Sequence, residues 1–234
     1  MTYPRFIGEI ENNFAFLKED ELKHAKVRRI KKGYKIEIND LKGNIFLAQV
    51  EEISKKYLKA KILEKLPPKE LNIKINLFLA VPNKPSKIDD LIEPISQLGT
   101  YSLTPVITKT SALKEKDILK KLEKWKKIAL NSIKQCERLY PLVINEPIKL
   151  KDIPKAERNF LFFEREKNNT LKEFLEDKAE NINILIGNEG GFIKEEVELL
   201  IKKDYKTISL GEHILTMETA VISAICQTNF VYCL

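Results

Sequence analysis

Two short apolar runs near the C-terminus, each ending at a glycine-bearing loop and each followed by a helical pattern, constrain the fold most. Residues 182–186 read Ile-Asn-Ile-Leu-Ile, a composition that suits a buried strand, and residues 187–191 then read Gly-Asn-Glu-Gly-Gly. A second run at 207–210 also stops at glycine, and helices are expected from near Lys194 and from Met217. Two strands that each lead through a loop into a helix predict an open α/β sheet, in which ligands bind at the carboxyl ends of the strands.

The loop at 187–191 admits more than one interpretation. Its glycines do not fit the Gly-x-Gly-x-x-Gly fingerprint of dinucleotide sites, and no Lys followed by Ser or Thr completes a phosphate-binding P-loop. The carboxylate of Glu189 would also repel a phosphate, so a neutral or cationic ligand with hydroxyl groups matches better. The other interpretation is a tight strand-to-helix turn that uses glycine only for its backbone freedom. The loop alone leaves both open.

Composition indicates a soluble chain with a sizeable core. The 234 residues are 43% hydrophobic and 32% charged, which leaves room for one large domain or two modest ones. Cys136, Cys226 and Cys233 show no metal-ligand spacing, so we expect reduced thiols in a cytoplasmic protein and no metal site. The N-terminus lacks the apolar core of a signal peptide, and no apolar stretch is continuous enough for a membrane span.

Residues 1–68 carry most of the excess positive charge, with 15 Lys and Arg against 10 Asp and Glu, or +5 of the net +7. Residues 23–35 contain seven Lys and Arg and no acid, which favours contact with nucleic acid over the alternative of a solvated helix face. Short strand-like runs separated by turns predict a small β-barrel here, at 14–17, 34–39, 44–50 and 57–63.

Strand and helix patterns alternate after a proline-containing linker at 66–71, which predicts a parallel sheet with covered faces. Strands are expected at 73–81, 102–108 and 160–163, and helices at 85–98, 118–136 and 170–178. The last helix, from Met217 to about Tyr232, is apolar nearly all round, so most of its faces have to be buried.

Taken together, the two loops resemble the RsmE family of 16S ribosomal RNA uridine N3-methyltransferases, which belongs to the SPOUT (knotted) superfamily. The family signatures Gly-Pro-Glu-Gly-Gly-Phe and Leu-Gly-x-x-Ile-Leu-Arg-x-Glu-Thr-Ala correspond to residues 187–192 and 210–220. The resemblance implies an α/β fold with two domains. A PUA-like RNA-binding β-barrel would occupy 1–68, and a SPOUT-type parallel-sheet methyltransferase domain with a C-terminal trefoil knot would occupy 72–234. It also implies a homodimer.

The resemblance implies methyl transfer from S-adenosylmethionine to a uridine N3 in 16S ribosomal RNA of the small subunit, without a metal. It implies that the donor is bound by Ile186, Gly187, Asn188, Gly190, Gly191, Leu210, Gly211, Ile214, Leu215 and Met217. Glu189 and Glu218 match family carboxylates, which would orient the ribose or accept a proton, and Arg138 would position phosphate or a uracil oxygen. RNA contacts are expected from Arg5, Lys26, Arg28, Arg29, Lys31 and Lys32.

Several positions depart from the family pattern. Thr216 and Thr110 stand where the family has Arg, Pro94 stands where it has Lys, and Asn188 replaces a proline. Losing basic groups near a negatively charged substrate weakens transition-state stabilisation, whereas loops that bind through backbone atoms survive such changes. Two alternatives therefore stay open: an RNA-binding homologue with weakened or lost catalysis, and a methyltransferase that acts on another RNA position.

Overall fold

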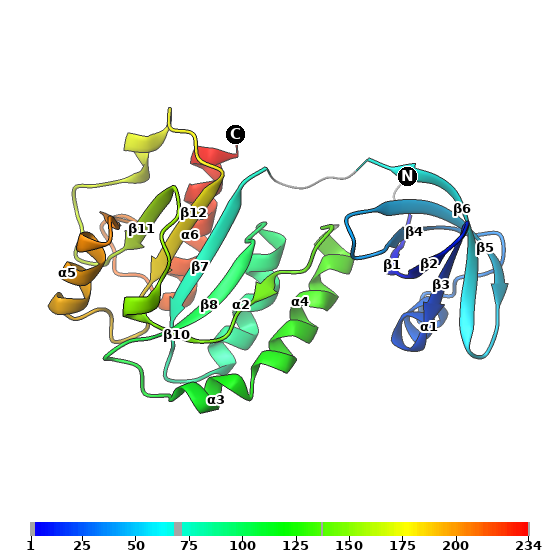
Figure 1. The fold of residues 1–234 in the computed structure, drawn as a ribbon, viewed down its shortest axis with the longest axis horizontal. Helices are drawn as coiled ribbons and strands as arrows, with labels where there is room; N and C mark the ends of the chain where they lie inside the picture. Colours follow the sequence, from blue (N-terminus) through cyan, green and yellow to red (C-terminus); the bar gives the residue numbers. More distant parts are fainter. Residues whose placement is uncertain (1–2, 68–71, 137, 234) are drawn as a thin grey trace. The chain divides into compact units, whose positions relative to one another are not determined.

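The computed structural model describes residues 3–67, 72–136 and 138–233, and these form two compact units (Figure 1). The first unit runs to residue 67 and also takes in 133–141, whereas the second holds the rest. The sequence predicted domains at 1–68 and 72–234, which places residues 133–141 in the second domain. In the structure this segment belongs to the first unit. Positions 68–71 of the expected linker lie outside the described residues.

A mixed sheet forms the first unit, and in the described residues its strand order is β1-β4-β5-β6-β3-β2. The strands are β1 (Arg5–Ile7), β2 (Glu9–Glu11), β3 (Phe14–Lys18), β4 (Lys35–Asn39), β5 (Ile45–Ile53) and β6 (Tyr57–Leu66), with helix α1 (Glu19–Val27) between β3 and β4. Strand β1 pairs parallel with β4, and the other pairs are antiparallel. Leu58 and Ala60 are buried in its core while Lys59 and Lys61 point outward, as the alternation in the sequence predicts.

The second unit is built on a parallel sheet whose order, in the part of the chain described, is β10-β8-β7-β12-β11-β13, with β9 paired to β8. The strands are β7 (Lys74–Ala80), β8 (Ser102–Ile107), β9 (Val143–Ile144), β10 (Ile148–Lys149), β11 (Arg158–Phe162), β12 (Asn181–Ile186) and β13 (Lys206–Ile208). Strand β12 lies between β7 and β11, and β13 pairs with β11. The two strands that precede the glycine loops are therefore separated by one strand.

Helices cover both faces of this sheet. They are α2 (Ser86–Gln97), α3 (Glu115–Leu119), α4 (Leu122–Cys136), α5 (Lys194–Lys202) and α6 (Met217–Tyr232), with short 3-10 turns η1 (Leu150–Asp152) and η2 (Leu171–Phe174). Apolar side chains of α2, α4 and α6 share one core with Ile75, Leu77 and Leu79 of β7. Those of α5 share a second core with Phe78 and Ala80 of the same strand, which point to the opposite face. The two-part α/β fold is thus confirmed, and the trefoil knot stays a prediction.

Two helix predictions were wrong in detail. The single helix expected at 118–136 is interrupted after α3, where Lys121 N–H bonds to the carbonyl of Ile118 at 2.8 Å in a three-residue turn. No α-helix spans the described residues 170–178, where the sequence predicted one. The 3-10 turn η2 forms there instead, with backbone bonds that run three residues back, as from Leu175 N–H to the carbonyl of Lys172 at 3.4 Å. None of the helices in the described ranges has both the length and the apolarity for a membrane crossing.

Candidate functional site

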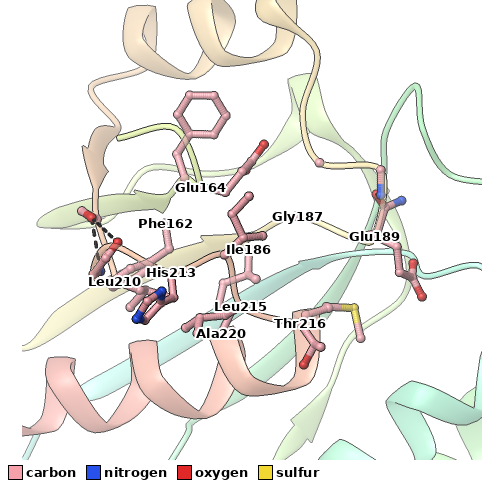
Figure 2. Close-up of a pocket in the computed structure, with 18 of the residues that line it drawn as sticks. Phe162, Glu164, Ile186, Gly187, Glu189, Leu210, His213, Leu215, Thr216 and Ala220 are labelled. Carbon is pink, nitrogen blue, oxygen red and sulfur yellow. Dashed lines mark hydrogen bonds between the residues drawn. The ribbon is translucent and has the colours of Figure 1, made fainter. Parts of the chain in front are cut away.

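The two glycine loops enclose one pocket of about 400 Å³ at the carboxyl end of the sheet of the second unit (Figure 2). Its wall includes every residue of the expected donor-binding set: Ile186, Gly187, Asn188, Gly190, Gly191, Leu210, Gly211, Ile214, Leu215 and Met217. The loops follow strands β12 and β13, as an open α/β sheet predicts. The structure brings these residues together, and their role in donor binding stays a prediction.

Asn188 organises the first loop with its own side chain, which is buried at 7% exposure. Its amide donates to the carbonyl of Val81 at 2.9 Å, and its Oδ1 accepts from Gly190 N–H at 3.0 Å and from the Thr110 hydroxyl at 2.9 Å. The same hydroxyl reaches the carbonyl of Gly191 at 3.0 Å. Two positions that depart from the family pattern, Asn188 and Thr110, are therefore direct partners that fix the loop.

Close approach and backbone conformation both require glycine in this loop. Gly191 has φ +62°, and a Cβ added there would lie 2.9 Å from Oε1 of Glu164. A Cβ on Gly190 would lie 2.9 Å from Cβ of Thr110. The loop is thus packed against neighbouring side chains while its backbone faces the pocket, which is the arrangement a backbone-binding ligand site needs.

The second loop turns at Gly211, whose φ of +126° is not open to residues with a side chain without strain. Ser209 closes the turn, since its hydroxyl accepts from Gly211 N–H at 3.2 Å and lies 3.3 Å from the Gly211 carbonyl. Thr216, which stands where the family has Arg, is the N-cap of α6 and accepts from Thr219 N–H at 3.4 Å. The fourth departure, Pro94, lies inside α2.

Apolar side chains and a carboxylate form the pocket's sides. In Figure 2, Glu164 lies on one side while Leu215 and Ala220 lie on the opposite side, with Ile186 between them. Ile214 differs from this pattern, because 83% of its side chain is exposed. Glu164 and Ala220 were not named as site residues from the sequence. Glu164 lies in no pattern that marks a site, whereas Ala220 is the last residue of the matched segment 210–220.

Lys87, in the first turn of α2, joins the two loops through charge. Its ammonium lies 2.9 Å from Glu189 and 3.0 Å from Glu218. Hydrogen bonds to these two carboxylates raise the pKa of Lys87. Burial alone would raise the pKa of Glu189. The hydrogen bonds that its carboxylate accepts from Lys87 and from backbone N–H groups, including that of Asn83 at 3.3 Å, outweigh burial and lower this pKa below the usual range.

Glu218 lies beside the pocket at the start of α6. Its own backbone N–H, followed by Lys87, lowers the pKa of Glu218 below the ordinary glutamate value. Both expected catalytic carboxylates are therefore held as anions next to the two glycine loops. Lys87 carries no motif signal of its own, so only the structure identifies it.

Arg138, the third expected catalytic residue, belongs to the first unit. Its backbone carbonyl accepts a hydrogen bond from the side-chain amide of Asn39 at 3.1 Å. It does not line the pocket of the second unit, and a catalytic role for it stays a prediction.

The expected RNA-binding residues fall into two groups. The exposed group consists of Lys26, Arg28, Arg29, Lys31 and Lys32. Arg5 differs, because it forms a two-bonded ion pair with Glu37 at 2.7 and 2.9 Å and only 10% of its side chain is exposed. Its guanidinium is thus committed to the interior of the first unit, which argues against the RNA contact expected from the sequence.

No set of three or more His, Cys, Asp or Glu side chains in the described residues is placed to hold a metal ion. Cys136, Cys226 and Cys233 are free thiols.

Comparison with known proteins gives consistent matches over most of the chain. Residues 69–229 match the RNA methyltransferase domain family, and residues 17–63 match the RNA methyltransferase PUA domain family. Ribosomal RNA small subunit methyltransferase E from Aquifex aeolicus is 35% identical over 93% of this chain and 94% of its own length. The same enzyme from Rickettsia conorii is 33% identical over 79% of this chain and 75% of its own.

A solved structure of ribosomal RNA small subunit methyltransferase E from Neisseria gonorrhoeae, bound to S-adenosyl methionine, superposes with a TM-score of 0.86. It is 21% identical and covers 99% of this chain and 98% of its own, so it supports the fold.

Proposed function

The chain belongs to the RNA methyltransferase family that matches residues 69–229, and from this we propose that it methylates N3 of a uridine in 16S ribosomal RNA of the small subunit, with S-adenosylmethionine as donor. The observation that carries this proposal is the convergence of all ten donor-set residues on one pocket. In this proposal residues 72–234 form the catalytic domain, and residues 1–68 form the RNA-binding domain.

The pocket fits the donor by chemistry as well as by size. Its volume of about 400 Å³ lies in the range of small-molecule sites, and the glycines of the first loop line it with backbone atoms. Ile186, Leu210 and Leu215 offer apolar surface to an adenine ring. Glu164 and Glu189 place negative charge on the wall, which suits a sulfonium cation and repels a phosphate.

The donor supplies an electrophilic methyl group when bound, so the protein has to align the uridine and remove the N3 proton. Glu189 of the first loop and Glu218 at the start of α6 are the two carboxylates that contact Lys87, and their lowered pKa values keep them ionised, so either can accept the proton. N3 lies on the base-pairing edge, so the target uridine has to be unpaired when it enters the site.

The exposed basic residues of the first unit support an RNA-binding role there. Lys26, Arg28, Arg29, Lys31 and Lys32 lie close in sequence and outside the buried core, and the match to a PUA domain covers the same region. Affinity that rests on such cations falls steeply with salt. Because the proposed substrate is ribosomal RNA of the small subunit, we propose that the reaction takes place in the cytoplasm.

We also propose that the protein is a homodimer formed around α6. This helix is apolar on most faces, yet Phe230 remains 61% exposed. A shallow groove lined by Leu91, Pro94 and Ile222 lies beside it. A second copy placed over this face would cover both features.

One experiment separates the possible functions. Unmodified small ribosomal subunits are incubated with the protein and methyl-labelled donor, and the RNA is then digested for nucleoside mass spectrometry. The proposal predicts label in 3-methyluridine. Label in another nucleoside would move the target, and donor binding by calorimetry without any transfer would support the RNA-binding alternative.

A further inference from the structure

Lys87 holds an unusual place among the described residues that line the pocket, because it is the one with a permanent positive charge. It reaches the pocket from α2, contacts Glu189 of the first loop at 2.9 Å and contacts Glu218 of α6 at 3.0 Å. Its side chain keeps 32% exposure, so it is open to a substrate. The ammonium therefore lies where three segments meet at the edge of the proposed methyl-transfer site.

The two carboxylates fix the position of this ammonium without exhausting its donors. A protonated lysine has three N–H donors, and the contacts to Glu189 and Glu218 use two of them. Carboxylate partners also raise the pKa of Lys87, so the charge persists at neutral pH. The remaining N–H is available to an oxygen atom that enters from the pocket.

Other groups at the site do not supply this charge. Thr110 and Thr216 replace basic residues of the family, and both hydroxyls have structural partners: Thr110 holds the first loop, and Thr216 caps α6. Neither side chain is a cation. The electrostatic stabilisation that these positions lack thus has one candidate source on the pocket wall.

We propose that Lys87 is a catalytic residue, an inference that rests on the proposed function. Its ammonium donates a hydrogen bond to a uracil carbonyl oxygen as N3 loses its proton. The N3 proton passes to the carboxylate of Glu189 or Glu218, and the charge that remains is shared between N3 and the neighbouring carbonyl oxygens. N3 then bonds to the methyl carbon while the methyl–sulfur bond breaks, and that electron pair stays on sulfur. A cation fixed beside the developing oxyanion lowers the barrier.

The variant Lys87→Gln tests this role, with Lys84→Gln as a matched control. Lys84 is exposed, lies three residues earlier and does not line the pocket. We expect single-turnover methylation at saturating donor to fall by about 100-fold in Lys87→Gln, as for the loss of one oxyanion donor, and to stay within about twofold in Lys84→Gln. Lys87→Arg keeps the charge and is expected to recover a large part of the rate.

A substrate with 5-fluorouridine at the target position distinguishes catalysis from a structural role. Fluorine makes N3 more acidic, so the anion needs less help, and the deficit of Lys87→Gln should shrink with this substrate. A deficit of equal size on both substrates, or a Lys87→Gln rate equal to that of wild type, would overturn the assignment. If the wild-type protein labels no uridine at all, the proposed function fails instead, and the two failures are therefore distinguishable.

Discussion

Replacing Asn188 with alanine should destabilise the second unit measurably, because one buried side chain supplies three hydrogen bonds. The carbonyl of Val81, itself fully buried, loses its 2.9 Å donor and keeps only the long 3.5 Å contact from the hydroxyl of Ser111, whereas the N–H of Gly190 lies in an exposed loop and can turn to water. An unsatisfied buried acceptor costs about 1–3 kcal/mol and an exposed hydrogen bond roughly 0.5–1 kcal/mol. We therefore expect the free energy of unfolding to fall by about 1.5–4 kcal/mol.

Urea denaturation followed by tryptophan fluorescence measures this loss in the right part of the molecule. Trp125 is the single tryptophan of the chain, is fully buried and packs in the core of the second unit. Thr110→Val removes the hydroxyl that contacts both Asn188 and the carbonyl of Gly191, so it should cost about 1–2 kcal/mol. The double variant should cost less than the sum of the two, because the side chains are partners.

A loss below about 0.5 kcal/mol for Asn188→Ala would contradict the structural role assigned to this side chain, because surface changes stay within that limit. Strict additivity with Thr110→Val would show instead that the two residues act independently.

Three further outcomes are expected. Gly211→Ala should weaken donor binding in calorimetry by imposing about 1–3 kcal/mol of backbone strain at φ +126°, whereas Gly33→Ala, at φ +89° with open space around it, should leave donor affinity unchanged. Arg5→Gln breaks the partly buried pair with Glu37 and should destabilise the first unit by about 2 kcal/mol in hydrogen exchange, with no loss of salt-dependent RNA binding. The pKa of Glu189 is lowered in the folded protein, so its ionised contacts are complete above the ordinary glutamate pKa of about 4.3. Donor affinity should therefore stay constant down to that pH and fall only as the pH drops further, through the lowered pKa of Glu189.

The sequence predicts those elements whose signals are local. Helix α6 begins at Met217 as predicted because Thr216 supplies a cap directly before an apolar run, and the glycine loops are recognisable from their own residues. Strands β1 and β2 have three residues each and are too short to show an alternation of buried and exposed side chains. The strand expected at 207–210 lies at Lys206–Ile208, because its bounds are set by the residues of β13 that pair with β11.

Contacts between distant segments were beyond reach of the sequence. Asn188 and Thr110 read as two separate departures from the family pattern, yet they form a hydrogen bond at 2.9 Å. Lys87 stands in a helix with no motif, and only folding places it between Glu189 and Glu218. Arg5 lies within residues 1–68, which carry most of the excess positive charge, but its pairing with Glu37 depends on the parallel register of β1 and β4.

A crystal structure with S-adenosylmethionine tests most directly whether the two glycine loops form one donor site. We predict the nucleoside between the loops, with backbone atoms of Gly187 and Gly211 within contact distance and the methyl group facing the edge where Lys87 lies. A donor bound elsewhere on the second unit, with the pocket between the loops empty at saturating concentration, would contradict the proposed function and the role assigned to Lys87.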